Sequence, residues 1–420
     1  MAPPMMPVTR PPTITVPAAA PTAALALAIA IAAAPAPARA EAARAEGLRI
    51  GLITTLSGPG AVVGADIRDG FALALTHAGG RLGGLDTRVI EADDQQKPDV
   101  AVGLANRMVE RERVDFVTGV IWSNLALAMM PTLAAAQTFF ISPNAGTAQL
   151  AGAQCNPYFF NVSWPVDSVG EAAGQAAQAQ GVRRVYALAP NYPAGKDVVA
   201  GFKRYFKGEI VGEVYTPLGQ LDYAAEIAQV RAAAPDGLFV FYPGGMGITF
   251  LKQYDQAGLL TRIPPVGLGF SFDQDVLGAV GDAALGVVNA LQWSPDLDTP
   301  ENRRFVADFK AAYGRIPSYY AAQSYDAARL IDGAVAAAGG ALADKERLRA
   351  ALESAPFASV RGRFRFNTNH YPIQNYYLRE VVRDEAGGLT NRLKGILFTD
   401  HADVHAKDCP MTAAAPAGAR

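Results

Sequence analysis

The sequence predicts an α/β protein with two doubly wound lobes, and three observations lead to that prediction. Short β-rich segments alternate with amphipathic segments of about 10–15 residues, the pattern of βαβ crossovers in a mostly parallel sheet. The alternation restarts near residue 165, so each half of the chain supplies its own sheet. Half of the 420 residues are apolar and 18% are charged, which suits a folded chain long enough for two domains.

The first α/β run begins with LRIGLITTL, an apolar segment of strand length bounded by a Gly-Pro turn. The later segment DVAVGLANRMVERE carries its apolar residues at helical spacing. By the same criteria, strands are expected at 48–56, 87–92, 114–121 and 138–142, and helices at 62–78, 99–112 and 124–136.

The second run follows the same rules, and its segment GLFVFY is an uninterrupted apolar strand of the kind buried inside parallel sheets. Strands are expected at 184–189, 210–216, 237–242, 265–269 and 285–291, and helices at 166–180, 196–206, 223–233 and 247–257.

After residue 300 the pattern changes, which indicates that the chain returns to both lobes. Helices are expected at 301–313, 318–338 and 345–353, strands at 363–367, 376–384 and 394–398, and a disordered tail at 412–420.

The N-terminus has the parts of a secretory signal peptide. Arg10 precedes an apolar run at 23–34, and the small-residue ending Ala38-Arg39-Ala40 precedes Glu41. The run is too short to span a bilayer. We therefore expect residues 1–40 to be a signal peptide cleaved after Ala40, leaving a soluble periplasmic protein.

The composition limits which binding partners and bound groups are expected. The formal net charge of −2 gives no basic surplus for a phosphate backbone, so no nucleic-acid partner is expected. Cys155 and Cys409 are an even pair in an exported chain, and one long-range disulfide is the simplest interpretation, with two unrelated thiols as the alternative. Their separation does not match a metal site.

Several motifs could suggest a catalytic or cofactor-binding role, but each lacks a feature that the role requires. The turn at 57–60 lacks dinucleotide-binding spacing, and Ser271 lacks the second glycine of a hydrolase elbow. His401 and His405 stand four residues apart, but a solvated C-terminal stretch explains them better than a metal. The acidic cluster of Glu91, Asp93 and Asp94, at the end of the second expected strand, is expected to be solvated or to cap a helix. We expect no enzyme activity, metal or cofactor.

Two turns at the carboxyl ends of neighbouring strands are more informative, because ligands of open α/β sheets bind there. Each turn precedes a helix start, with Ser123 as the expected N-cap of the first helix. Free N–H groups at two adjacent helix starts suit a carboxylate. The residues of these turns are Trp122, Ser123, Asn124, Ser142, Asn144, Ala145 and Gly146.

Four segments then resemble one family. LRIGLITTLSGPGAVVGADIRDGFALAL, EADDQQKPDVAVGLANRMVERERVDFVTG, ISPNAGTA and YYAAQSYDAARLIDGAV are similar to the leucine/isoleucine/valine-binding type of periplasmic solute-binding protein, from about residue 48 to 398. The resemblance implies a type I periplasmic binding protein fold whose two lobes are joined by three crossings, and a solute delivered to an ABC permease. It places lobe I at 48–164 plus about 295–368 and lobe II at 165–294 plus about 369–400.

The resemblance also implies site residues. Ser123 and Ser142 to Gly146 match the carboxylate grip of lobe I, and Val63 matches a position that packs on the solute. In lobe II, Tyr192 matches an aromatic faced by turns containing Gly244, Phe270 and Ser271. Amino-acid binders carry an acid after the strand that ends at Gly269, whereas this chain reads Phe270-Ser271-Phe272 before Asp273.

Without that acid, an ammonium group in a closed cleft would be unpaired and costly. Aromatic residues at strand ends, and the segments LAGAQCNPYFFNVSWPVD and AKDC, resemble the subgroup that binds aromatic acids such as benzoate. We therefore expect a monomeric receptor for a small aromatic carboxylate. The alternatives are a branched-chain amino-acid receptor and a ligand sensor coupled to a membrane signalling partner.

Overall fold

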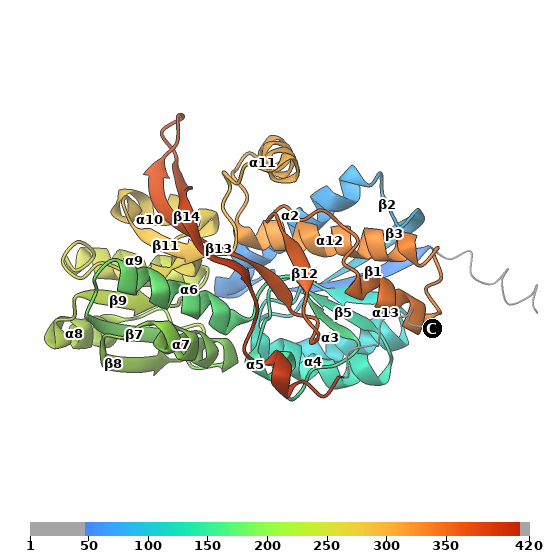
Figure 1. The fold of residues 1–420 in the computed structure, drawn as a ribbon, viewed down its shortest axis with the longest axis horizontal. Helices are drawn as coiled ribbons and strands as arrows, with labels where there is room; N and C mark the ends of the chain where they lie inside the picture. Colours follow the sequence, from blue (N-terminus) through green and yellow to red (C-terminus); the bar gives the residue numbers. More distant parts are fainter. Residues whose placement is uncertain (1–46, 412–420) are drawn as a thin grey trace, which may run out of the picture. The chain divides into compact units, whose positions relative to one another are not determined.

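The computed structural model describes residues 47–411, which fold into two α/β lobes (Figure 1). The expected signal peptide and the expected disordered tail lie outside the described residues. Within them, no helix is both long and apolar enough to cross a bilayer.

Lobe I is built on a sheet whose strands run in the order β2-β3-β1-β4-β5-β6. All neighbours from β3 to β6 pair in parallel, and β1 lies between β3 and β4, which makes the sheet doubly wound. The strands are β1 (Leu48–Thr54), β2 (Arg81–Leu82), β3 (Leu85–Asp93), β4 (Phe116–Thr118), β5 (Phe139–Ser142) and β6 (Phe159–Asn161).

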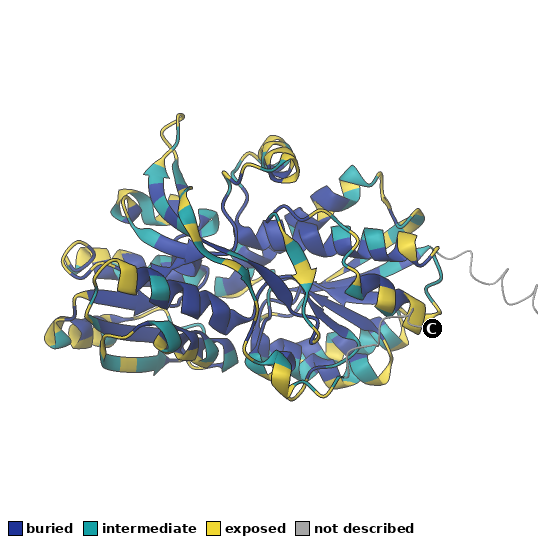
Figure 2. Ribbon diagram, in the orientation of Figure 1, coloured by how far each residue is buried: buried dark blue, intermediate teal, exposed yellow. Residues whose placement is uncertain are grey.

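The helices of lobe I pack in pairs, α2 with α12 and α3 with α4. Their apolar sides and the strands form a continuous buried layer (Figure 2). The helices are α2 (Ala61–His77), α3 (Pro98–Glu110), α4 (Ser123–Ala135), α5 (Ala148–Ala151), α12 (Tyr319–Ala337) and α13 (Lys345–Glu353), with the short 3₁₀ turn η2 (Gly58–Gly60) before α2.

Lobe II repeats the strand order of lobe I. Strands β8-β7-β9 are parallel, a bridge from Leu238 to Pro265 continues toward β10, and β10 pairs with β11 in parallel. Beyond β11, the hairpin β13-β14 continues the sheet, and β13 pairs antiparallel with both β11 and β14. The strands are β7 (Arg184–Pro190), β8 (Glu209–Thr216), β9 (Gly237–Val240), β10 (Gly267–Leu268), β11 (Val288–Leu291), β13 (Pro372–Arg383) and β14 (Leu389–His401).

Helix α6 packs along α7 in lobe II, and α9 contacts α10. The remaining elements are α6 (Val166–Ala179), α7 (Pro193–Tyr205), α8 (Ala224–Ala233), α9 (Gly245–Gln256), η3 (Gly269–Ser271), α10 (Gln274–Val280), η4 (Gly281–Ala284), α11 (Pro300–Tyr313), β12 (Phe364–Phe366) and η5 (Ala406–Asp408).

Most expected elements are present, and the differences have physical reasons. Strand β6, helix α10 and the four-residue α5 were not predicted, because segments this short carry little periodicity. The last strand is thirteen residues long rather than five, since its pairing with β13 extends it over polar positions. Tertiary pairing overrides local composition there.

The C-terminal segment was expected to be solvated, and this is wrong for its two histidines, while neighbouring residues such as Val404 and Lys407 are exposed as expected. His401 Nε2 lies 2.6 Å from Glu171 Oε2, and His405 Nε2 lies 2.6 Å from Asp167 Oδ2, both on α6. The disulfide between Cys155 and Cys409 is confirmed, with the Cα atoms 5.5 Å apart.

Candidate functional site

A narrow cavity lies between the carboxyl ends of the two sheets, and the 310 Å³ of empty space at this site includes space that is open to solvent. Lobe I contributes the loops after β4 and β5, and lobe II contributes those after β7, β9 and β10. This is where doubly wound sheets bind ligands. The lining residues are Ile121, Trp122, Ser123, Asn144, Gly146, Trp164, Val166, Tyr192, Ala194, Phe241, Pro243, Phe270 and Tyr320, and none of them is charged.

Trp122 is held in place from behind by a chain of hydrogen bonds. Its indole Nε1 donates to Thr55 Oγ1 at 2.8 Å, and the Thr55 hydroxyl donates to Asp94 Oδ1 at 2.5 Å. Asp94 is fully buried, and burial raises the pKa of its carboxyl above the usual range. The acid that closes β3 therefore supports the cavity wall rather than facing solvent.

Ser123 begins α4, and the residue before it is the N-cap, one position earlier than expected. Leu125 and Ala126 both donate their N–H groups to the carbonyl of Trp122, which fixes the helix start at that residue. Ser123 is 2% exposed and lines the cavity. Its hydroxyl and the N–H groups of Ser123 and Asn124, the first two of a thirteen-residue helix, offer donors to an anion.

The second helix start is only partly available to a ligand. Ala148, the first residue of α5, donates its N–H to Asp197 Oδ2 of α7 at 2.9 Å. Gly146, two residues earlier, does line the cavity. A Cβ built on Gly146 overlaps the carbonyl oxygen of Trp164, so only glycine allows this approach.

Six of the thirteen lining residues are aromatic. Tyr192 meets Trp122 edge to face at 6.1 Å between ring centroids and stacks on Phe241 at 6.3 Å. Phe270 packs against Trp164 at 4.9 Å and Phe241 at 5.0 Å. Burial, with a smaller effect of Asp197, raises the pKa of Tyr192, which keeps its hydroxyl protonated. Such a cavity suits a planar apolar ligand body.

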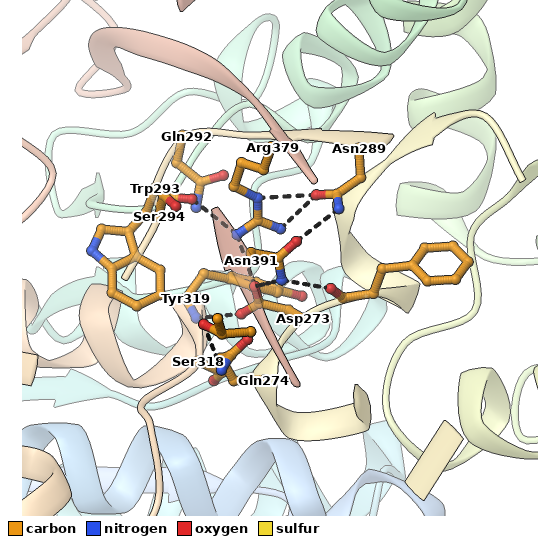
Figure 3. Close-up of polar contacts among 12 residues, drawn as sticks. Asp273, Gln274, Asn289, Gln292, Trp293, Ser294, Ser318, Tyr319, Arg379 and Asn391 are labelled. Atoms are coloured by element: carbon orange, nitrogen blue, oxygen red, sulfur yellow. Dashed lines mark hydrogen bonds and ion pairs between the residues drawn. The ribbon is translucent and has the colours of Figure 1, made fainter. Parts of the chain in front are cut away.

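Asp273 is occupied by the protein itself (Figure 3). Its Oδ1 accepts from Arg379 Nη1 at 2.8 Å, and its Oδ2 accepts the backbone N–H of Tyr319 at 2.8 Å. Asp273 and Arg379 are both fully buried, and Arg379 also donates to Asn289. Neither oxygen of this carboxylate is left over for a ligand ammonium.

Half of the residues that we predicted for the site line the cavity, namely Trp122, Ser123, Asn144, Gly146, Tyr192 and Phe270. The others lie outside the lining, and three of them hold turns. The Ser142 hydroxyl donates to the carbonyl of Ala145, and the Ser271 hydroxyl bonds the backbone of Tyr242. The remaining residues outside the lining are Val63, Asn124 and Gly244.

Val63 and Gly244 meet at a separate contact between the lobes. A Cβ on Gly244, whose φ is +57°, would lie 3.1 Å from Val63 Cγ2. The pair thus helps to close the cleft away from the cavity wall.

Sequence reasoning missed Ile121, Trp164, Val166, Ala194, Phe241 and Tyr320 as lining residues. Trp164 and Val166 belong to a crossing between the lobes, and Tyr320 is the second residue of α12, which packs mainly on α2. Only the folded arrangement brings these segments to the sheet ends. Phe241 could have been found from the sequence. It directly precedes Tyr242 at the end of the expected strand 237–242, and successive side chains of a strand point to opposite faces, so the two rings were expected on different faces.

Among the described residues, no group of three or more His, Cys, Asp and Glu side chains is placed to hold a metal ion. The cavity offers hydrogen-bond donors and rings, and no lining side chain is a base such as His, Asp or Glu. This arrangement is suited to binding.

Comparison with known proteins agrees with the fold. A curated relative, the Leu/Ile/Val-binding protein homolog 6 of Brucella melitensis, is 28% identical over 359 residues, which cover 83% of this chain and 91% of the relative. An R. palustris ABC transporter solute-binding protein solved with benzoate is 33% identical, with a TM-score of 0.82, and 87% of this chain and 100% of that chain are covered.

A second solute-binding protein, from Rhodopseudomonas palustris BisB5, was solved with 3,4-dihydroxybenzoic acid. It is 32% identical, with a TM-score of 0.80 and coverage of 85% of this chain and 98% of that one. The model of the periplasmic binding protein family matches residues 47–387. The chain therefore belongs to the periplasmic binding protein family.

Proposed function

We propose that this protein is a periplasmic receptor that captures a small aromatic carboxylate and delivers it to an ABC permease. The observation that carries the proposal is a cavity walled by aromatic rings, with no charged side chain in its lining. The ligand ring lies between Tyr192 and Phe270, next to Trp122. Ser123 and the first N–H groups of α4 hold the carboxylate.

Two solute-binding proteins at 32–33% identity support this ligand class, because they were solved with benzoate and 3,4-dihydroxybenzoic acid. Branched-chain amino acids are the second candidate, favoured by the Brucella relative. The engagement of Asp273 with Arg379 and Tyr319 counts against them. An ammonium without a carboxylate partner would cost several kcal/mol in a closed cleft.

A thermal-shift screen tests the ligand class. Benzoate and hydroxybenzoates should raise the melting temperature, because a ligand that binds only the folded state stabilises it by mass action. Leucine, isoleucine and valine at equal concentration should leave it unchanged. A shift with the amino acids and none with the aromatic acids would reject the proposal.

Delivery to a permease, export and lobe boundaries are further parts of the proposal. The N-terminus supports cleavage after Ala40, and we propose that lobe I spans 48–164 plus about 295–368 and lobe II spans 165–294 plus about 369–400. Strand β12, near the end of the second lobe I segment, pairs with β13 of the lobe II sheet. Uptake of labelled benzoate by a strain lacking the gene separates transport from sensing. Uptake should fall if the protein delivers its ligand, and unchanged uptake would favour the sensor.

A further inference from the structure

Two aspartates of lobe II reach across the cleft to the first N–H group of a lobe I helix. Asp197 of α7 accepts from Ala148 N of α5 at 2.9 Å, and Asp273, which precedes α10, accepts from Tyr319 N of α12 at 2.8 Å. Helix α5 follows β5 of the lobe I sheet, and α12 packs on α2 of the same lobe. Both hydrogen bonds therefore join one lobe to the other.

The two contacts are next to different lining residues of the cavity. Asp197 stands five residues after Tyr192, and Ala148 stands two residues after Gly146, so this contact borders the wall formed by those two lining residues. Tyr319 directly precedes the lining residue Tyr320, and its contact with Asp273 is drawn in Figure 3. Neither aspartate lines the cavity.

The first N–H groups of a helix have no partner within the helix, so the N–H groups of Ala148 and Tyr319 both need an acceptor from outside. In the nineteen-residue α12 this N–H group also lies at the positive end of the helix dipole. When the lobes separate, each N–H exchanges its carboxylate for water, and the charge-assisted hydrogen bond is lost. Each contact thus stabilises the closed form over the open form without touching the ligand.

We propose that Asp197 and Asp273 are closure residues, whose carboxylates hold the cleft shut by capping lobe I helices. This role rests on the proposed receptor function, and it gives a reason for the acid at 273 other than binding an ammonium. Asp273 is held in place by Arg379, whose Nη1 also donates to the carbonyl of Trp293 at 3.0 Å. Asp197 is partly exposed, so its substitution disturbs the folded protein less than substitution of the fully buried Asp273.

The test uses Asp197→Ala and Asp197→Asn in the full mature protein, with benzoate as the probe and tryptophan fluorescence in a stopped-flow instrument as the readout. Asp197→Ala should weaken benzoate binding by roughly tenfold, the equivalent of one charge-assisted hydrogen bond. The loss should lie in a faster dissociation rate at an unchanged association rate, since the encounter takes place in the open form. Asp197→Asn, which keeps an acceptor oxygen, should lose less.

Asp344→Ala is the matched control. Asp344 caps α13 by accepting the N–H of Arg347 at 3.1 Å, entirely within lobe I. This variant should keep wild-type affinity and dissociation rate, although it loses a helix cap. Wild-type dissociation from Asp197→Ala, or an equal change in Asp344→Ala, would overturn the proposal. Asp273→Asn, which preserves the shape of the buried side chain, should also dissociate faster than wild type.

Failure of the ligand assignment can be told apart from failure of the closure residues. If the wild type binds no aromatic acid, the proposed function fails, and distances between spin labels at the exposed positions Ala225 of α8 and Ala336 of α12 then report closure directly. Asp197→Ala should shift that distance distribution toward longer separations. A distribution identical to that of the wild type would contradict the closure role.

Discussion

Gly146 shows how one residue without a side chain sets the geometry of the site. Its backbone approaches the carbonyl of Trp164 so closely that a methyl group would overlap it. Trp164 in turn lines the cavity and packs on Phe270. The small size of Gly146 therefore fixes the distance between the lobe I loop and the crossing that carries Trp164.

Gly146→Ala should lower ligand affinity by at least tenfold, because Trp164 or the loop must move to make room for the methyl group. Calorimetry with benzoate measures the effect. Gly103→Ala is the control: a Cβ at this exposed position of α3 meets no atom within 4 Å. It should keep full affinity and gain about 0.5–1 kcal/mol of stability. Equal affinity of Gly146→Ala and wild type would show that the loop tolerates the shift.

At the scale of elements, the C-terminal segment ties parts of both lobes together. The disulfide joins Cys409 to Cys155 in the loop between α5 and β6, while His405 contacts Asp167 of α6. A loop of 254 residues closed by the disulfide constrains the unfolded chain by about 5 kcal/mol in the chain-entropy model. The segment thus links the loop after α5 of lobe I to α6 of lobe II.

The contact of His405 with Asp167 predicts a pH dependence. The hydrogen bond that His405 donates to the Asp167 carboxylate is the main cause that raises the pKa of His405 above its usual 6.5. A histidine whose pKa is raised by folding contributes stability that is complete below the unfolded pKa, and this contribution is lost as the pH rises through the folded pKa. His405→Gln should therefore lower the melting temperature more at about pH 5.5 than at about pH 9.

Thermal unfolding followed by circular dichroism at the two pH values measures this difference. Lys407→Gln, an exposed charge change in the same segment, should give a small effect at both values. An equal loss for His405→Gln at low and high pH would mean that the contact does not depend on protonation.

At the scale of the whole molecule, the fold could be predicted from the sequence wherever a long segment has a clear hydrophobic periodicity. The strand LRIGLITTL and the helix at 318–338 fall within a few residues of β1 and α12, and the turns after β4 and β5 do meet at the cavity. The occupation of Ala148 N by Asp197 could not be predicted, because it depends on how closed the two lobes are. The pairing of Asp273 with Arg379 likewise joins residues 106 positions apart.

The central claim is that an aromatic carboxylate, and not an α-amino acid, fills the cavity. Isothermal titration calorimetry of the mature protein with benzoate and with leucine tests it most directly. We predict saturable benzoate binding with a negative heat-capacity change from burial of the ring, weakened by about 1.5–3 kcal/mol in Ser123→Ala, and no heat of binding with leucine. Tight leucine binding with no response to benzoate would contradict the account.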